Sequence, residues 1–242
     1  MVILVTGATG GICEKLIIKL AVNHSIIAVA RNLGRLKILK NSVGKNLEIK
    51  SIDVSKQNQV MKLFASISKV DAIINAAAVL NPVGKFSKNN IDQWKENINI
   101  NLLGTVYTCY FGIPLLLKSK KGKIINFAGG GSVYPRPEHS AYATSKTAVV
   151  RFSETIAKEF PSLDINVIAP GAYRTNMWKD EIYDKEPQKW GDINYLLLFF
   201  EFLLSEKSNG ITGKFIHYKD NWEKFNKKMS EKDLYTLRRV EK

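Results

Sequence analysis

Short apolar runs alternate with helix-like segments along almost the whole of this 242-residue chain. Such a rhythm predicts an α/β fold in which a doubly wound parallel sheet, with right-handed crossovers, is flanked by helices in a single domain. The helical segments are expected at 57–68, 91–118, 142–160 and 193–204. The strands are expected at 2–5, 25–30, 47–52, 71–75, 123–126, 164–169 and 214–217.

A glycine-rich turn separates the first strand from the helical pattern that follows it. Strand, glycine-rich turn and helix form the context that a phosphate-binding loop needs, because the backbone can approach a pyrophosphate and the helix N-terminus supplies N–H donors. A tight turn without a ligand is the alternative. The residues predicted to bind a dinucleotide here are Thr6, Gly7, Thr9, Gly10, Gly11 and Ile12.

The end of the second strand indicates which dinucleotide is preferred. In a dinucleotide-binding fold this strand end faces the adenosine ribose, where a carboxylate would accept a hydrogen bond from the 2′-hydroxyl of NAD. Here Ala30 is followed by Arg31, with Arg35 one turn further on. Because a guanidinium matches a 2′-phosphate, we expect NADP(H) to be preferred, with NAD(H) as a possible cofactor; a solvated arginine is the alternative.

Tyr142 and Lys146 are four residues apart in a segment that reads as a helix, so their side chains share one helical face. A phenol beside an ammonium is a usable acid/base pair, and the positive charge is expected to lower the pKa of the tyrosine toward working pH. An exposed Tyr and a solvated Lys on a surface helix form the alternative.

Together these motifs resemble the short-chain dehydrogenase/reductase family over residues 2–218, which implies a Rossmann-type fold and hydride transfer between a nicotinamide and a carbonyl or alcohol carbon. Tyr142 would move the proton, Lys146 would hold the nicotinamide ribose, and Asn101 would anchor a water linked to Lys146. The resemblance implies further cofactor contacts at Asp53, Val54, Asn75, Ala76, Ala77, Pro170, Gly171 and Thr175. The C-terminal portion is similar to a smaller branch whose members are often associated with bacterial surface-polysaccharide metabolism.

The serine of the family's catalytic set is missing. Alignment on Tyr142 places it at Ala128 or Gly129, and neither residue has a hydroxyl. Losing one donor to the substrate oxygen costs about 100- to 1000-fold in rate. Ser132, a backbone N–H of the glycine run 129–131, or a group of the substrate must therefore replace it, and Ser132 is taken as the fourth catalytic candidate.

These features predict an NADP(H)-dependent enzyme, an oxidoreductase acting on a polar and possibly sugar-derived small molecule. A cofactor-binding protein with little turnover is the alternative that the missing serine supports. An epimerase or dehydratase that uses the same tyrosine and a bound nicotinamide is a further alternative.

The predicted organisation is a domain of residues 1–218, with a substrate lid at about 176–191, and a helical extension at 219–242. Trp222, Phe225 and Met229 would form an apolar stripe on that extension, packed on the same domain or on a sister subunit. The apolar helices at 91–118 and 142–160 predict a homodimer or homotetramer. His139 is interpreted as a surface-loop residue.

The formal net charge is +14, but the basic residues are scattered, so we expect no nucleic-acid partner. The longest apolar run, 195–204, is too short to span a membrane, and none is expected as a partner. Two cysteines form no disulfide framework, and no Cys/His cluster has metal-ligand spacing, so no metal is expected. A cytoplasmic location follows from this pattern.

Overall fold

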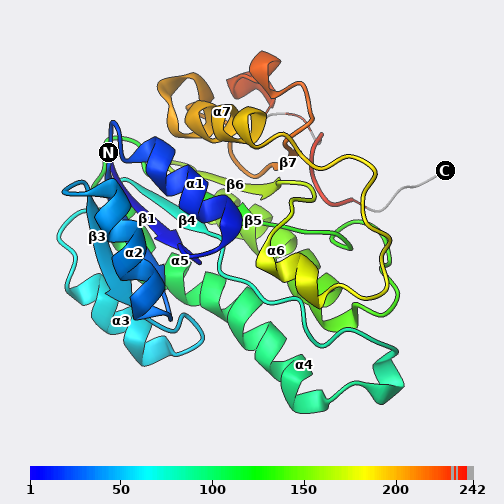
Figure 1. Cartoon of the computed structure of the whole chain (residues 1–242). Helices are drawn as coiled ribbons and strands as arrows, with labels where there is room; N and C mark the ends of the chain where they lie inside the picture. Colours follow the sequence, from blue (N-terminus) through cyan, green and yellow to red (C-terminus); the bar gives the residue numbers. More distant parts are fainter. Residues whose placement is uncertain (230–231, 233, 239–242) are drawn as a thin grey trace.

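A seven-stranded, all-parallel sheet forms the centre of the computed structural model, which describes residues 1–229, 232 and 234–238 (Figure 1). The strand order is β3-β2-β1-β4-β5-β6-β7, which confirms the doubly wound fold expected from the alternating pattern. The strands are β1 Val2–Thr6, β2 Ser25–Ala30, β3 Leu47–Ser51, β4 Ala72–Asn75, β5 Lys123–Phe127, β6 Asp164–Ala169 and β7 Phe215–His217.

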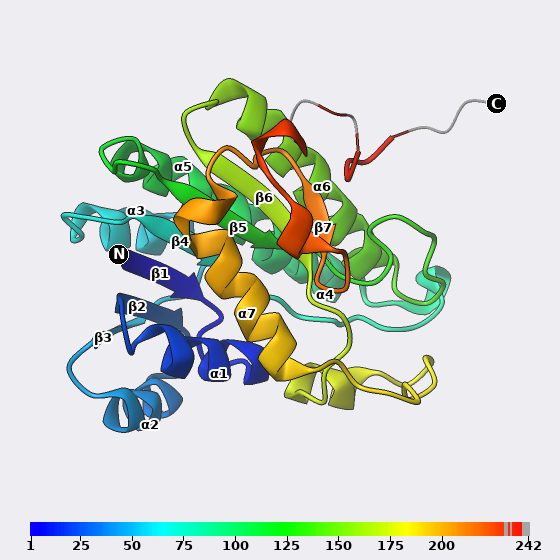
Figure 2. The same ribbon diagram turned by 90° about the horizontal axis from the view of Figure 1, so that it is seen from above.

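Helices cover both faces of the sheet (Figure 2). One face packs against α1 (Gly11–Leu20), α2 (Leu33–Val43) and α7 (Ile193–Leu204). The other packs against α3 (Gln57–Ala65), α5 (Gly104–Leu116) and α6 (Ser140–Glu159). Because the sheet is covered on both sides, its strands read as continuous apolar runs rather than as an alternation, and every residue of β4 and β5 is buried.

The strand order reverses at β1: β2 and β3 lie on one side of it, and β4 to β7 lie on the other. A crevice opens outside the carboxyl ends of the strands at such a switch point. Gly7 lies there at φ +67°, and a Cβ on it would come within 2.7 Å of the backbone nitrogen of Ala77. Only glycine lets the turn after β1 pack this closely on the loop after β4.

The long helical region expected at 91–118 is interrupted in its middle. It consists of α4 (Ile91–Ile98), a π-helical turn (Asn99–Leu103) and α5. Single π turns inside α-helices are frequent at functional sites, and this one carries Asn101.

The C-terminal segment is not the continuous helix expected from its apolar spacing. Two short 3₁₀ turns, Trp222–Lys224 and Lys227–Met229, replace it. Trp222 is buried, with ring centroids 5.3–5.4 Å from Tyr195, Phe199 and Phe202 on α7. The segment therefore packs on its own domain at this point; the side chain of Met229 lies outside the described residues.

Within the described part of the chain, none of the helices has both the length and the apolar character needed to cross a membrane.

Candidate active site

A cavity of about 1230 Å³ lies at the carboxyl ends of β1, β2, β4, β5 and β6. It is larger than the few hundred to 1000 Å³ typical of a site for one small ligand. The predicted cofactor-contacting residues that line it are Gly7, Thr9, Gly10, Gly11, Ile12, Arg31, Asp53, Val54, Ala76, Ala77, Tyr142, Lys146, Pro170, Gly171 and Thr175. Most of the residues predicted to contact the cofactor thus lie around one cavity.

Two predicted cofactor residues lie behind the cavity wall instead. Thr6 is 2% exposed, and its hydroxyl oxygen accepts hydrogen bonds from the backbone nitrogens of Ala76 (3.1 Å) and Ala77 (3.3 Å). The amide of Asn75 donates to Asn126 (2.8 Å) in the interior. Thr6 holds the loop after β4, and Asn75 ties the end of β4 to β5 and α5, so their contribution to a ligand would be indirect.

The helix α1 points its N-terminus at the cavity. Its first helical hydrogen bond runs from Glu14 N to Gly10 O at 2.9 Å, so the N–H groups of the residues between them precede the helical ladder. Gly11 and Ile12 line the cavity at this point. Open N–H donors and the positive end of the helix dipole suit a phosphate group.

Two arginines follow β2, but their surroundings differ. Arg35 donates to the Glu14 carboxylate at 2.7 Å. The guanidinium of Arg31 makes no ion pair or hydrogen bond with the residues that the structure describes, and it lines the cavity. Of the two, Arg31 is therefore the arginine with an unengaged cationic group at the end of β2.

Tyr142 and Lys146 lie on one face of α6, as their spacing predicts, and both are buried. The Lys146 nitrogen is 5.9 Å from the centroid of the Tyr142 ring and donates to Phe127 O at 2.9 Å. Burial lowers the pKa of Lys146 to about 8. It raises the pKa of Tyr142 to about 12, and the charge that acts in the opposite direction is that of Arg136.

The expected lowering of the Tyr142 pKa by Lys146 was therefore wrong for this structure, because burial outweighs charge. A phenol that keeps its proton at neutral pH can serve as a proton donor. The positive charge that assists it comes from Arg136, a residue that the sequence pattern did not single out.

Asn101 is fully buried in the π turn and does not line the cavity. Its Oδ1 accepts from Val79 N at 2.8 Å, and its Nδ2 donates to Asn97 and Ser145 at 2.8 and 3.1 Å. Because Ser145 is on α6 and Val79 follows β4, the side chain ties the loop after β4 to the helix of Tyr142 and Lys146. This arrangement gives Asn101 a positioning role.

The loop after β5 shows where the family serine would lie. A Cβ placed on Gly129 would be 2.3 Å from the hydroxyl oxygen of Tyr142, so position 129 directly faces that hydroxyl. Ser132 is 1% exposed, and its hydroxyl donates to Gly129 O at 2.8 Å and accepts from Gly129 N at 3.2 Å. Because this hydroxyl closes the turn and lies outside the cavity lining, the structure does not bear out Ser132 as the substrate's donor.

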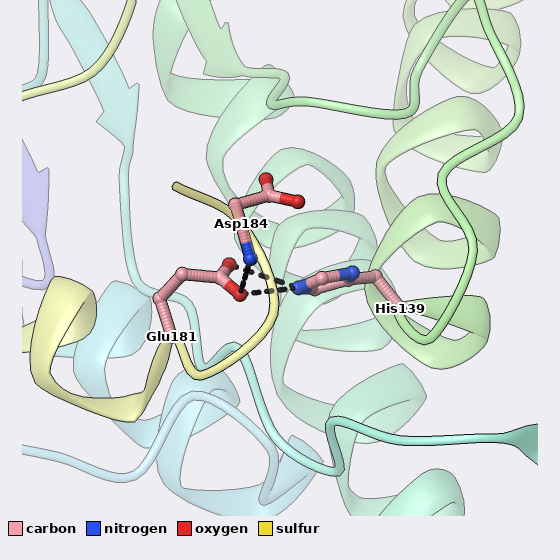
Figure 3. A group of neighbouring side chains, drawn as sticks. All are labelled: His139, Glu181 and Asp184. Carbon is pink, nitrogen blue, oxygen red and sulfur yellow. Dashed lines mark hydrogen bonds and ion pairs between the residues drawn. The ribbon is translucent and has the colours of Figure 1, made fainter. Parts of the chain in front are cut away.

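An ion-pair network joins this loop to residues 176–191, which we call the lid segment (Figure 3). His139 is completely buried, contrary to the surface position expected for it, and its Nε2 is 2.8 Å from the Glu181 carboxylate. Glu181 also accepts from the backbone nitrogens of Tyr183 and Asp184, both at 3.0 Å. Burial opposes ionisation, but these hydrogen bonds and His139 hold the pKa of Glu181 below its usual value.

Arg136 completes the network. Its NH2 donates to Glu181 at 2.6 Å, and its Nε and NH2 both donate to one Asp184 oxygen, at 3.0 and 2.6 Å. The same guanidinium is 6.0 Å from the centroid of the Tyr142 ring. Sequence reasoning missed this residue; its only signals are its place in the glycine-rich loop before Tyr142 and the acidic residues of the lid segment.

Comparison with known proteins identifies the family. The family model for short chain dehydrogenases matches residues 1–186. An uncharacterised oxidoreductase of Staphylococcus saprophyticus is 31% identical over 76% of this chain and 78% of its own length. The chain belongs to the short-chain dehydrogenase family.

The chain is also similar to a second relative in sequence and to a solved structure. An NADP-dependent 3-hydroxy acid dehydrogenase of Escherichia coli is 29% identical over 71% of this chain and 72% of its own. The crystal structure of serine dehydrogenase from Escherichia coli has a TM-score of 0.68 and 27% identity, covering 71% of this chain and 83% of that one.

Proposed function

We propose that this protein is an NADP(H)-dependent oxidoreductase that transfers hydride between the nicotinamide and a carbonyl or alcohol carbon of a small polar substrate. The observation that carries the proposal is the placement of Tyr142 and Lys146 on the wall of the same cavity that Arg31 borders at the other end. The name of the NADP-dependent relative from Escherichia coli supports the choice of cofactor.

The residues present fit an NADP(H) molecule. The N-terminus of α1 would hold the pyrophosphate, Arg31 the 2′-phosphate, and Asp53 the adenine side, where one oxygen of its carboxylate already accepts from Ser55. Lys146 would hold the nicotinamide ribose. When bound, the reduced cofactor supplies the hydride that the reaction needs.

In the direction of reduction, Tyr142 donates its phenolic proton to the substrate oxygen, and the pKa of about 12 keeps that proton in place at neutral pH. Lys146, whose pKa of about 8 leaves it largely charged at neutral pH, would hold the nicotinamide ribose, and the charge that favours the remaining phenolate is that of Arg136. Asn101 holds the helix of both residues in register. A water anchored near Asn101 and linked to Lys146 stays a prediction.

The substrate end of the cavity supports a polar substrate. It is lined by Tyr134, Trp178 and Asp180, which combine aromatic faces with a charged group, in addition to Arg136. We propose hydroxy or carbonyl compounds, including sugar-derived ones, as the substrate class.

The test follows NADPH consumption by its fluorescence with a panel of α-dicarbonyls, β-keto esters, β-keto acids and aldoses. We expect turnover of at least one compound and its loss by 1000-fold or more in Tyr142→Phe, because that change removes the proton donor. Unchanged turnover in Tyr142→Phe would contradict the family mechanism for this protein.

A second function, cofactor binding with little turnover, is favoured by Gly129, which leaves no hydroxyl beside Tyr142. It predicts NADPH binding without consumption across the whole panel. The epimerase or dehydratase alternative instead predicts a protein that retains its nicotinamide through purification and gel filtration.

We also propose that copies of the chain associate into a dimer or tetramer through α4, α5 and α6. Exposed apolar side chains on α4 and α5 and just after α5 support it, with Ile91 55%, Tyr110 71% and Leu117 48% exposed. Light scattering at micromolar concentration tests this, and a monomer would contradict it. A cytoplasmic location stays a prediction.

A further inference from the structure

The turn of residues 129–132 lacks a side chain that could donate a hydrogen bond to the substrate oxygen. Position 129 faces the Tyr142 hydroxyl but is glycine, and the Ser132 hydroxyl is bonded to the backbone of Gly129. A carbonyl oxygen that receives its proton from Tyr142 would therefore have that one donor unless another group reaches it.

Arg136 is the side chain that extends along this turn. A Cβ on Gly130 would be 3.3 Å from NH1 of Arg136, whereas a Cβ on Gly129 would be 2.3 Å from the Tyr142 hydroxyl. The guanidinium edge and the hydroxyl thus lie against adjacent residues, whose Cα atoms are about 3.8 Å apart. The guanidinium carbon is 6.0 Å from the centroid of the Tyr142 ring, and Arg136 lines the cavity.

The hydrogen bonds of Arg136 leave one edge without an acceptor. Nε and NH2 are held by Glu181 and Asp184, whereas NH1 makes no hydrogen bond with the residues that the structure describes. The side chain is 18% exposed. NH1 is not among the buried atoms without a partner in the described part of the chain, so it stays accessible and a ligand acceptor can reach it.

We propose that Arg136 takes over the role of the missing serine and donates a hydrogen bond from NH1 to the substrate oxygen that Tyr142 protonates. The inference rests on the proposed reductase function. Hydride adds to the carbonyl carbon, the C=O π electrons move to the oxygen, and the Tyr142 proton forms the O–H bond. Arg136 keeps its protons throughout, and it stabilises the negative charge that develops on the oxygen.

The surroundings of Arg136 favour this role over recognition of a substrate carboxylate. Glu181 and Asp184 already place two negative groups on the guanidinium. A third full negative charge beside them would be repelled, whereas an oxygen that gains only partial charge in the transition state would not meet the same repulsion. Neutral carbonyl compounds should therefore be reduced better than matched keto acids.

The test compares three variants on ethyl acetoacetate and acetoacetate, a neutral and an anionic form of one β-keto compound, or on the most active neutral and acidic pair of the panel. Arg136→Met should lower kcat by 100- to 1000-fold on the neutral compound, with NADPH affinity within about threefold. Asp184→Asn, which removes one lid ion pair but keeps the donor, should lower kcat by less than tenfold. Arg174→Met, at an exposed lid-side arginine paired with Glu186, should leave activity unchanged.

Chemical rescue separates donation from a structural role. Millimolar guanidinium should raise the kcat of Arg136→Gly at least tenfold, and it should not raise the kcat of Tyr142→Phe. If the parent enzyme turns over and Tyr142→Phe is inactive, but Arg136→Met keeps its kcat, the inference fails while the proposed function stands. It fails too if Arg136→Met raises only the KM for acetoacetate, or if Asp184→Asn loses as much kcat as Arg136→Met. A parent without turnover on the whole panel overturns both.

Discussion

Lys146 is a buried cation, and its burial makes the stability of the folded protein depend on pH. The residue is 2% exposed, and its nitrogen has one hydrogen-bond acceptor, Phe127 O at 2.9 Å, among the described residues. Burial lowers its pKa from 10.5 to about 8. Because a lowered lysine pKa means that the folded state disfavours the proton, the charged side chain destabilises the folded protein.

The difference between 10.5 and about 8 corresponds to a destabilisation of about 3 kcal/mol. Below pH 8 the lysine is charged in both states, and the cost is present in full. Between pH 8 and 10.5 the unfolded chain binds more protons than the folded one, so the free energy of unfolding rises with pH. Above pH 10.5 the cost has disappeared.

Lys146→Met removes the charge and keeps an unbranched side chain. At one pH its effect is ambiguous, because the lost hydrogen bond to Phe127 costs about 1–3 kcal/mol in the other direction. The pH dependence is not ambiguous. We expect the free energy of unfolding of the variant minus that of the parent to fall by about 2–3 kcal/mol from pH 7 to pH 10, measured by urea unfolding at fixed protein concentration without added cofactor.

Lys95→Met, at a lysine that is 65% exposed, is the matched control, and its difference from the parent should change by less than about 0.5 kcal/mol over the same range. If the free energy of unfolding of Lys146→Met minus that of the parent stays constant with pH, or grows as pH rises, Lys146 is not a buried and destabilising charge.

Three further changes test other parts of the molecule. Arg31→Ala should weaken NADPH binding by about 10- to 100-fold and NADH binding by less than about threefold, because only NADPH carries the 2′-phosphate; fluorescence titrations that show equal weakening would contradict the cofactor assignment. Gly129→Ala should lower kcat by at least about tenfold on the best panel substrate, since its Cβ would lie 2.3 Å from the Tyr142 hydroxyl and displace it; an active variant would place that hydroxyl elsewhere. Trp222→Ala should cost about 3–5 kcal/mol in urea unfolding through lost packing on α7, and a cost below 1 kcal/mol would show that the C-terminal segment is not part of the fold.

The fold could be predicted because its signals are local. The apolar run at 164–169 and the helix at 193–204 match β6 and α7 residue for residue. In a buried parallel sheet each strand is a continuous apolar run, so the strand pattern survives without knowledge of its neighbours. The prediction of a helix in the C-terminal segment was wrong. Three apolar residues there have helical spacing, but the packing of Trp222 on the aromatic side chains of α7 determines the local structure.

The site could be predicted only where spacing along one element fixes the geometry. Tyr142 and Lys146 share a face because they are four residues apart on α6. Arg136 is separated from Glu181 and Asp184 by 45 and 48 residues in the sequence, so a local sequence pattern cannot predict that they pair. The burial of His139 depends on the same lid segment, so its surface assignment was wrong for the same reason.

Several departures from ordinary sequence rules lie in the loop after β5 and on the helix that follows it. A buried lysine, a buried histidine facing a carboxylate, and a glycine facing the Tyr142 hydroxyl all lie there. In an ordinary core each would be selected against, because buried charge and missing side chains reduce stability. Gly129 and Lys146 both lie beside Tyr142, and such a grouping is the pattern expected where stability is given up for chemistry. It also argues that Gly129 and Arg136 belong to one arrangement, since a Cβ on Gly129 would meet the Tyr142 hydroxyl and a Cβ on the next residue, Gly130, would lie 3.3 Å from the guanidinium.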